Sequence, residues 1–331
     1  MRRYYGIEFL RLLTSLSILL YHYRHFFNPY TTYSVNSFEE SKTYFPFYSV
    51  LKIFYNDGSY GVHMFYTISG FVFAYIYLSI KDDVSGKEFF INRLARLYPL
   101  HFATLIIVAL LQIINWSTTN SFQIVHNNDL YHFFLNLFFI SSWGFEEGHS
   151  FNAVIWSVSV EVFIYGIFFI LLTLLKKYKL FFSFILCLIL LSFYKFDIYD
   201  SLFLECARLF FLGVFVYFLS KNIKKKYLLF SVPIICFAIY LSFVGNFKLY
   251  LFCPTVLLLV ILSEEIIRNK KIQNFFQVCG NLTYALYLLH IPMQLGILLL
   301  IKKLNISDIL YLKTHFFLIY FGVLILSAYF C

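Results

Sequence analysis

Long hydrophobic runs, separated by shorter polar segments, recur along the whole chain of 331 residues. An apolar run of about 20 residues is long enough to cross a bilayer as an α-helix. The pattern predicts ten spans, so we expect an all-α, polytopic membrane protein that forms a single domain over residues 1–331. The predicted spans are 7–27, 60–80, 98–115, 155–175, 180–194, 201–219, 227–244, 249–267, 281–301 and 314–330.

The basic residues predict the orientation of these spans. Short loops rich in Lys and Arg face the cytoplasm. The basic clusters at 2–3, 176–179, 221–226 and 268–271 all fall on that side if the chain crosses ten times with both termini cytoplasmic. A full crossing by the short apolar run 131–140 would invert everything after it, so we expect this run to be re-entrant or interfacial.

Composition narrows the class of protein further. Hydrophobic residues make up 61% of the chain and charged residues 13%, whereas a soluble domain carries about 25% charged residues. The net charge of +9 comes from short basic loops, so we expect no nucleic-acid partner. The six cysteines are scattered without a C-x-x-C pair and predict neither disulfides nor a metal site. We also expect no cleavable signal peptide, because no small-residue cleavage site follows the first apolar run.

The first predicted span carries a polar stripe. Arg11 and His22 are eleven residues apart, so they share a helix face at a separation of about 16 Å along the axis. Glu8 and Ser15 fall on the same face. Ionisable side chains at membrane depth are candidates for function by default. The alternative is that Arg11 extends to the cytoplasmic interface and His22 is a hydrogen-bonded core residue.

A second basic motif, Arg93 and Arg96, lies on the predicted cytoplasmic side just before Pro99, where we expect a helix to start. Arginines three apart on one helix face can bind two phosphate groups. The alternative is that the pair only enforces membrane topology. His22 and His25 have no carboxylate or cysteine near them in the sequence, so we predict no metal there.

Polar residues also mark the fourth predicted span. Ser157, Glu161 and Tyr165 recur every four residues and so share one face. A carboxylate inside a membrane helix usually pairs or titrates. Glu161 is therefore expected either to hold a cation such as Arg11 or to orient a catalytic group.

Two further spans contain candidate residues whose structural and functional interpretations both stay open. In the second span, Ser69 and Gly70 favour close helix packing over a nucleophilic role for the serine. In the ninth span, His290 stands two residues before Pro292, which should kink the helix. A structural, hydrogen-bonded histidine at this position is as well supported as a site residue.

These motifs, taken in order, resemble the acyltransferase-3 family, integral-membrane enzymes that O-acylate bacterial surface polysaccharides and related glycans. The resemblance extends over nearly the whole chain. One departure is Glu8, where many members carry Asp. We expect no appended soluble hydrolase-like domain, so the resemblance is to the short stand-alone members. The motifs that carry the resemblance are 7–11 with His22, 65–71, 93–96 with Pro99, 156–161 and 284–292.

The resemblance implies an acyl-CoA-dependent O-acyltransferase of the bacterial cytoplasmic (inner) membrane, with multiple spans. The implied donor is cytoplasmic acyl-CoA, usually acetyl-CoA, as a co-substrate with no bound cofactor. The implied acceptor is a sugar hydroxyl of a surface polysaccharide, such as lipopolysaccharide or capsule, or of a lipid-linked glycan. The lipid bilayer is the remaining partner.

Acyl transfer to a hydroxyl needs a base for its proton and a donor for the developing oxyanion. His22 is a titratable group in the first span whose ordinary pKa is near neutrality, and it lies on the polar stripe, so we predict that it is the base. Glu8 lies about 21 Å away along the helix axis, too far to orient His22. We predict that Glu8 orders Arg11, and that Glu161 or a backbone carbonyl orients His22.

The family resemblance assigns the donor side. Arg93 and Arg96 are expected to bind the phosphates of coenzyme A, with Arg11 near the thioester or pantetheine and Ser69 as a further donor-binding candidate. The other candidates are Ser157, Tyr165 and His290.

Two other functions remain open from the sequence. The first is a membrane transporter of a glycan or acyl-bearing metabolite, since carriers also have polar groups within their spans and Pro-interrupted helices. Carriers often show paired half-repeats, and none is visible in this sequence. The second is a sensor or scaffold in which the polar stripes only join helices.

Overall fold

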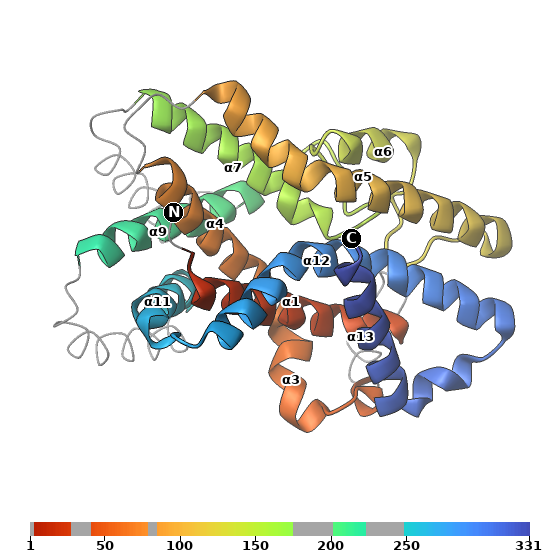
Figure 1. Cartoon of the computed structure of the whole chain (residues 1–331). Coiled ribbons are helices and arrows are strands. Elements are labelled where there is room, and N and C mark those ends of the chain that lie inside the picture. Colours follow the sequence, from red (N-terminus) through yellow and green to blue (C-terminus); the bar gives the residue numbers. More distant parts are fainter. Residues whose placement is uncertain (1–2, 28–40, 79–84, 175–200, 223–247) are drawn as a thin grey trace. The chain divides into compact units, whose positions relative to one another are not determined.

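The computed structural model describes residues 3–27, 41–78, 85–174, 201–222 and 248–331, and this part of the chain is all helical (Figure 1). Its α-helices are α1 (Tyr5–His22), α3 (Tyr48–Asp57), α4 (Gly61–Tyr77), α5 (Gly86–Thr119), α6 (Leu130–Leu137), α7 (Ile155–Leu174), α9 (Leu202–Asn222), α11 (Lys248–Leu262), α12 (Lys270–Leu304) and α13 (Thr314–Tyr329). Short 3-10 helices occur at η1 (Tyr23–Phe26), η2 (Lys42–Tyr44), η3 (Gly58–Tyr60), η5 (Ser263–Ile266) and η6 (Ser307–Leu312).

Five of the described helices are long and apolar enough to cross a membrane. They are α5, α7, α9, α12 and the segment Leu249–Ile266, which joins α11 to η5. Three other predicted spans coincide with α1, α4 and α13, of which α13 is a shorter apolar helix. The predicted spans 180–194 and 227–244 lie outside the described residues. The all-helical class is thus confirmed over the described part, and the count of ten spans stays a prediction.

Helix α5 begins much earlier than the sequence analysis expected. The sequence predicts a helix start near Pro99, but α5 starts at Gly86 and carries Pro99 in its interior. Ser85 stands before the first turn and accepts a hydrogen bond from the backbone N–H of Glu88 at 3.5 Å. A serine followed three residues later by a glutamate is an N-terminal capping signal. An apolar helix tolerates an internal proline because neighbouring groups satisfy the freed backbone.

The described residues belong to two compact units, which are described separately below. Unit 1 comprises Met1–Thr14, Tyr60–Ile91 and Val160–Asn281. Unit 2 comprises Ser15–Ser59, Asn92–Ser159 and Leu282–Cys331. The division falls within helices α1, α5, α7 and α12.

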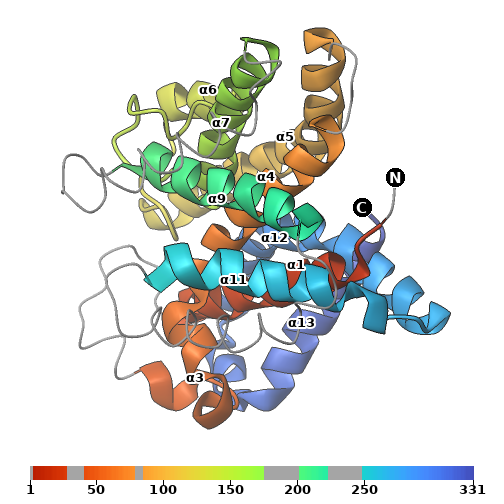
Figure 2. The same cartoon turned by 90° about the vertical axis from the view of Figure 1, so that its left-hand side faces the viewer.

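In unit 1, α4 packs closely along α9 (Figures 1 and 2). A Cβ at Gly70 of α4 would overlap the carbonyl of Phe210, and a Cβ at Gly213 of α9 would overlap the carbonyl of Thr67. Small residues let helix backbones approach in this way. The glycine at 70 therefore serves the close helix contact that the Ser69-Gly70 pair predicted.

In unit 2, the end of α1 is held by an aromatic cluster around Tyr23. Its ring lies 6.0 Å from Tyr320 and 5.5 Å from Phe317 of α13, between ring centroids. Phe26 makes an edge contact with Phe316 at 4.9 Å. Both Tyr23 and Phe26 are buried. Edge-to-face and tilted aromatic pairs add specific geometry to the burial of their apolar area, so this cluster fixes the residues that follow His22.

Candidate functional site

The last residue of α1, His22, faces His290 of α12 within unit 2. His22 Nδ1 lies 2.9 Å from His290 Nε2, and the two rings are stacked with their centroids 5.0 Å apart. His290 is completely buried. The two residues are 268 positions apart in the sequence, so the fold brings together two candidates that the sequence analysis named separately.

Gln294 joins this pair to a third histidine. Its amide nitrogen donates to the backbone carbonyl of His22 at 3.0 Å, and its amide oxygen lies 3.0 Å from His25 Nδ1. Because an amide oxygen only accepts hydrogen bonds, His25 carries a hydrogen on Nδ1. Sequence reasoning missed Gln294. A buried polar residue one turn after His290 in an apolar helix is the signal that points to it.

The start of α7 is bound to the same stretch of α12. Ser157 Oγ lies 2.8 Å from the hydroxyl of Tyr287, and that hydroxyl donates to the carbonyl of Val154 at 2.9 Å. Asn152 donates to the carbonyl of Leu288 at 3.0 Å. Ser157 and Asn152 are buried. Ser157 therefore ties α7 to the turn of α12 that precedes His290.

The two arginines of the R-x-x-R motif lie inside α5, in unit 2. Arg93 is half-buried and Arg96 is exposed. Just after them, the carbonyl of Leu97 accepts a hydrogen bond from the Tyr284 hydroxyl of α12 at 2.7 Å. This contact fixes the helix turn that carries the arginines. Guanidinium groups spaced by three helical residues can contact adjacent anionic oxygens.

In unit 1, Glu8 lies between two arginines. Its Oε2 is 3.1 Å from Arg11 Nη1, and its Oε1 is 3.4 Å from Arg3 Nη2. The beginning of α1 is held by the buried Glu264, which accepts hydrogen bonds from the backbone N–H groups of Tyr5 and Gly6 at 2.7 and 2.8 Å. A carboxylate at a helix N-terminus satisfies free N–H groups and complements the helix dipole. Glu264 thus fixes the helix turn that presents Glu8.

Three other predicted residues lie in unit 1. Tyr165 is buried and its ring stacks on Phe73 at 4.3 Å. Ser69 and Glu161 are half-buried on α4 and α7. The placement of Tyr165 is that of a packed core residue.

Sequence reasoning missed one imidazole–carboxylate pair in unit 1. His63 Nε2 of α4 lies 2.7 Å from Glu205 Oε1 of α9. An acidic residue in the first turn of an apolar helix was the available signal. Over the described residues, no group of three or more His, Cys, Asp or Glu side chains is placed to hold a metal ion.

Comparison with known proteins identifies the family. A family model described as "Acyltransferase domain" matches residues 4–331, which is essentially the whole chain. The chain belongs to the acyltransferase-3 family. No curated protein and no solved structure matches it. Family membership together with the apolar helices indicates a membrane acyltransferase.

For an acyltransferase, the paired imidazoles of unit 2 offer base chemistry at a residue that the sequence analysis predicts. An imidazole acts as a general base when one nitrogen is unprotonated and a partner orients the other. His290 is placed to be that partner for His22 Nδ1. Orientation of His22 by Glu161, the alternative from the sequence, stays a prediction.

Proposed function

We propose that this acyltransferase moves an acyl group, acetyl by family resemblance, from acyl-CoA to a sugar hydroxyl of a surface polysaccharide or lipid-linked glycan, and that His22 is its general base. The observation that carries the proposal is the 2.9 Å contact between His22 Nδ1 and His290 Nε2. A base held by a second group in a buried site follows the logic of nucleophile-activating pairs in other acyl-transfer enzymes.

The contact defines the proton positions that the chemistry needs. To accept a proton at Nε2, His22 keeps its hydrogen on Nδ1 and donates it to Nε2 of His290. His290 is then neutral, with its own hydrogen on Nδ1. Gln294, through the backbone carbonyl of His22, holds the end of α1 against α12 while the rings stay stacked.

The transfer step follows from this arrangement. The acceptor hydroxyl oxygen attacks the thioester carbonyl carbon while Nε2 of His22 takes the hydroxyl proton. A C–O bond forms and the C–S bond breaks, and the thiolate of coenzyme A leaves. That thiolate takes the proton from the His22 imidazolium, so the products are the sugar ester, coenzyme A thiol and neutral His22.

Charge supports an assignment of the donor side. We infer that Arg93 and Arg96 bind the phosphates of coenzyme A, because guanidinium groups match phosphate geometry. We infer that Arg11, held by Glu8 at 3.1 Å, acts near the pantetheine arm, which extends from the phosphates toward the thioester. Ser69 is kept as a further donor-binding candidate, and Glu161 as a further catalytic candidate.

The same proposal includes the membrane topology. The chain crosses the bacterial cytoplasmic membrane ten times with both termini inside, so that the donor is bound from the cytoplasm. The α1 residues Glu8 and Arg11 then lie near the cytoplasmic face, and His22 lies deeper, about 16 Å further along the helix axis. The hydroxyl acceptor reaches His22 from the other side.

The test is label transfer by purified protein. Radiolabelled acetyl-CoA and an extract of cell-surface glycan are supplied to wild type, to His22→Ala and to His126→Ala, which changes an exposed histidine. We expect label in glycan with wild type and His126→Ala and none with His22→Ala. Full transfer by His22→Ala would reject the base assignment. A transporter would be favoured by two results together: no protein transfers label with any of several acyl donors, and the wild-type protein moves glycan into vesicles.

A further inference from the structure

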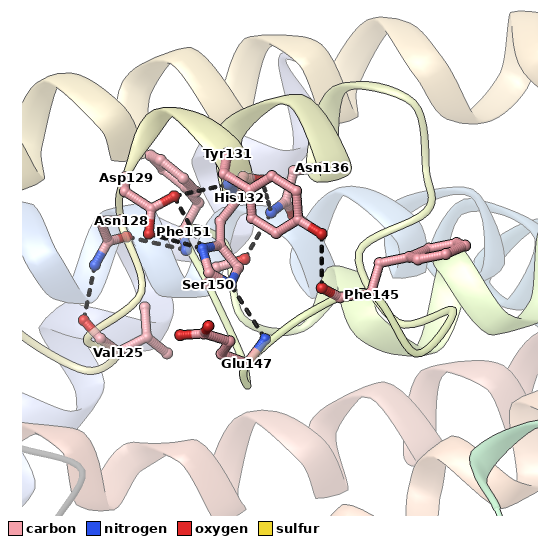
Figure 3. A network of polar contacts seen from close by, with 10 residues as sticks. All are labelled: Val125, Asn128, Asp129, Tyr131, His132, Asn136, Phe145, Glu147, Ser150 and Phe151. Atoms are coloured by element: carbon pink, nitrogen blue, oxygen red, sulfur yellow. Dashed lines mark hydrogen bonds and ion pairs between the residues drawn. The ribbon is translucent and has the colours of Figure 1, made fainter.

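The segment between α6 and α7 is held in place by polar contacts to α6 and to the turn before it (Figure 3). The hydroxyl of Tyr131 donates to the carbonyl of Phe145 at 2.8 Å, and the amide nitrogen of Asn136 donates to Ser150 Oγ at 2.7 Å. The backbone N–H of Phe151 donates to the side-chain oxygen of Asn128 at 3.0 Å. Three contacts over seven residues give residues 145–151 a fixed path, which we call the site loop.

His132 and Asp129 supply a fourth contact. The carboxylate of Asp129 lies 2.8 Å from His132 Nδ1, and it also accepts a bond from the backbone N–H of His132. Because a carboxylate only accepts, the His132 hydrogen sits on Nδ1. Nε2 of His132 is then the acceptor for the backbone N–H of Glu147, at 3.3 Å. Both ring nitrogens are used, so His132 anchors the site loop and is not itself a base.

The site loop leads to the His22–His290 pair. One residue beyond the loop, Asn152 donates to the carbonyl of Leu288, two positions before His290 on α12. Asn152, three residues after His149, therefore ties the anchored loop to the turn of α12 that carries His290.

His149 has an aromatic neighbour at the start of α7. The ring centroids of His149 and Trp156 are 6.0 Å apart, with 39° between the ring planes. His149 is exposed and Trp156 is half-buried. The next residue, Ser157, contacts Tyr287, whose ring is 6.0 Å from His290. Trp156 and His149 thus form a partly exposed aromatic edge, and Ser157 and Tyr287 connect the start of α7 beside this edge to His290.

Such an edge suits a sugar ring. The indole offers a broad apolar face with a polar N–H, and the imidazole offers a hydrogen-bonding nitrogen at its rim. Binding sites commonly combine aromatic walls with a few placed polar groups that fix orientation. A pyranose has apolar C–H faces and hydroxyl groups around its edge, so its face can stack on an indole while a hydroxyl meets the imidazole.

We propose that His149 and Trp156 form the acceptor-binding edge of the His22–His290 site, where a sugar ring stacks on Trp156 and one of its hydroxyls hydrogen-bonds to His149. This inference rests on the proposed function and adds the residues that contact the acceptor. In this proposal, the contacts of Asp129 and His132 fix the loop that presents His149 to the sugar.

The test separates acceptor binding from donor binding. Transfer is measured at saturating acetyl-CoA over a range of glycan extract, and at saturating glycan over a range of acetyl-CoA. The variants are Trp156→Leu, which removes the aromatic face, Trp156→Phe, which keeps part of it, and His149→Ala. The matched controls are Trp116→Leu and His126→Ala, which change an exposed tryptophan and an exposed histidine of the same unit.

We expect Trp156→Leu and His149→Ala to raise the KM for glycan about tenfold, and Trp156→Phe to raise it less. The KM for acetyl-CoA and both controls should stay at wild-type values. An unchanged KM for glycan, or an equal rise in both KM values, would overturn the acceptor edge while leaving the proposed function in place. If Trp156→Leu fails to fold, His149→Ala decides alone. Absence of transfer by wild type would instead overturn the proposed function and this inference with it.

Discussion

The carboxylate of Glu8 lies directly against Gly280 of α12 and occupies the space that a Cβ at position 280 would fill. A methyl group there would overlap Glu8 Oε2, so only glycine leaves room for the Glu8 side chain in its present position. The same carboxylate lies 3.1 Å from Arg11. The glycine therefore sets where the Glu8–Arg11 ion pair can form.

Gly280→Ala should displace Glu8 and weaken its contact with Arg11. Overpacking of this kind typically costs about 1–3 kcal/mol of stability, and we expect transfer to fall about tenfold if Arg11 acts on the donor. Glu8→Asp in the same protein moves the carboxylate but keeps the Cβ, which lies 2.7 Å from the position of the new methyl group, so it should recover only part of the loss. Thermal unfolding and label transfer measure the two effects. An additive loss in the double variant would contradict the steric explanation.

Arg93→Ala with Arg96→Ala should raise the KM for acetyl-CoA about tenfold or more, because two charge-assisted contacts to phosphate are removed. The KM for glycan should not change. Lys302→Ala with Lys303→Ala is the matched control, since it removes two exposed charges from the end of α12. An unchanged KM for acetyl-CoA in the arginine variant would leave the motif with a topological role only.

Asp129 should stabilise α6 in a pH-dependent way. Its slight burial raises its pKa, but the hydrogen bonds from the backbone and imidazole of His132 outweigh this and hold the pKa of Asp129 below its ordinary value. A carboxylate with a lowered pKa contributes stability above its ordinary pKa of about 3.9 and loses it as the pH falls through the folded value.

Asp129→Ala should therefore destabilise the protein at neutral pH by about 1 kcal/mol, the usual cost of losing a helix N-cap. The difference from wild type should shrink below about pH 4. Thermal unfolding of both proteins across pH measures this. A difference that stays constant down to acid pH would show that the charge of Asp129 contributes nothing.

The sequence predicted the helical class and the local pairs of this protein well. Hydrophobic runs report burial or membrane depth directly, and Glu8 and Arg11 are three residues apart on one helix, so their contact follows from helix periodicity. The capping signal at Ser85 and Glu88 is also present in the sequence, but Pro99, a residue type common in the first turn of a helix, favoured a later helix start.

The contacts between distant segments could not be predicted in the same way. His22 and His290 are 268 positions apart, and periodicity places each on a helix face without saying which faces meet. Residues 145–151 lack a periodic pattern, so the hydrogen bonds that hold them could not be predicted from the sequence either. His149 and Gln294 become candidate site residues only through these tertiary contacts.

The most direct test of the central claim is a double-mutant cycle on His22 and His290, with label transfer from acetyl-CoA to glycan measured for wild type, His22→Ala, His290→Ala and the double variant. Residues that act as a unit show grossly non-additive losses, and removal of a general base typically costs about 10²–10⁴-fold in rate. We predict that His22→Ala and the double variant lose the same activity, since His290 acts through His22. Independent losses that multiply in the double variant, or wild-type activity in His290→Ala with the protein folded, would contradict it.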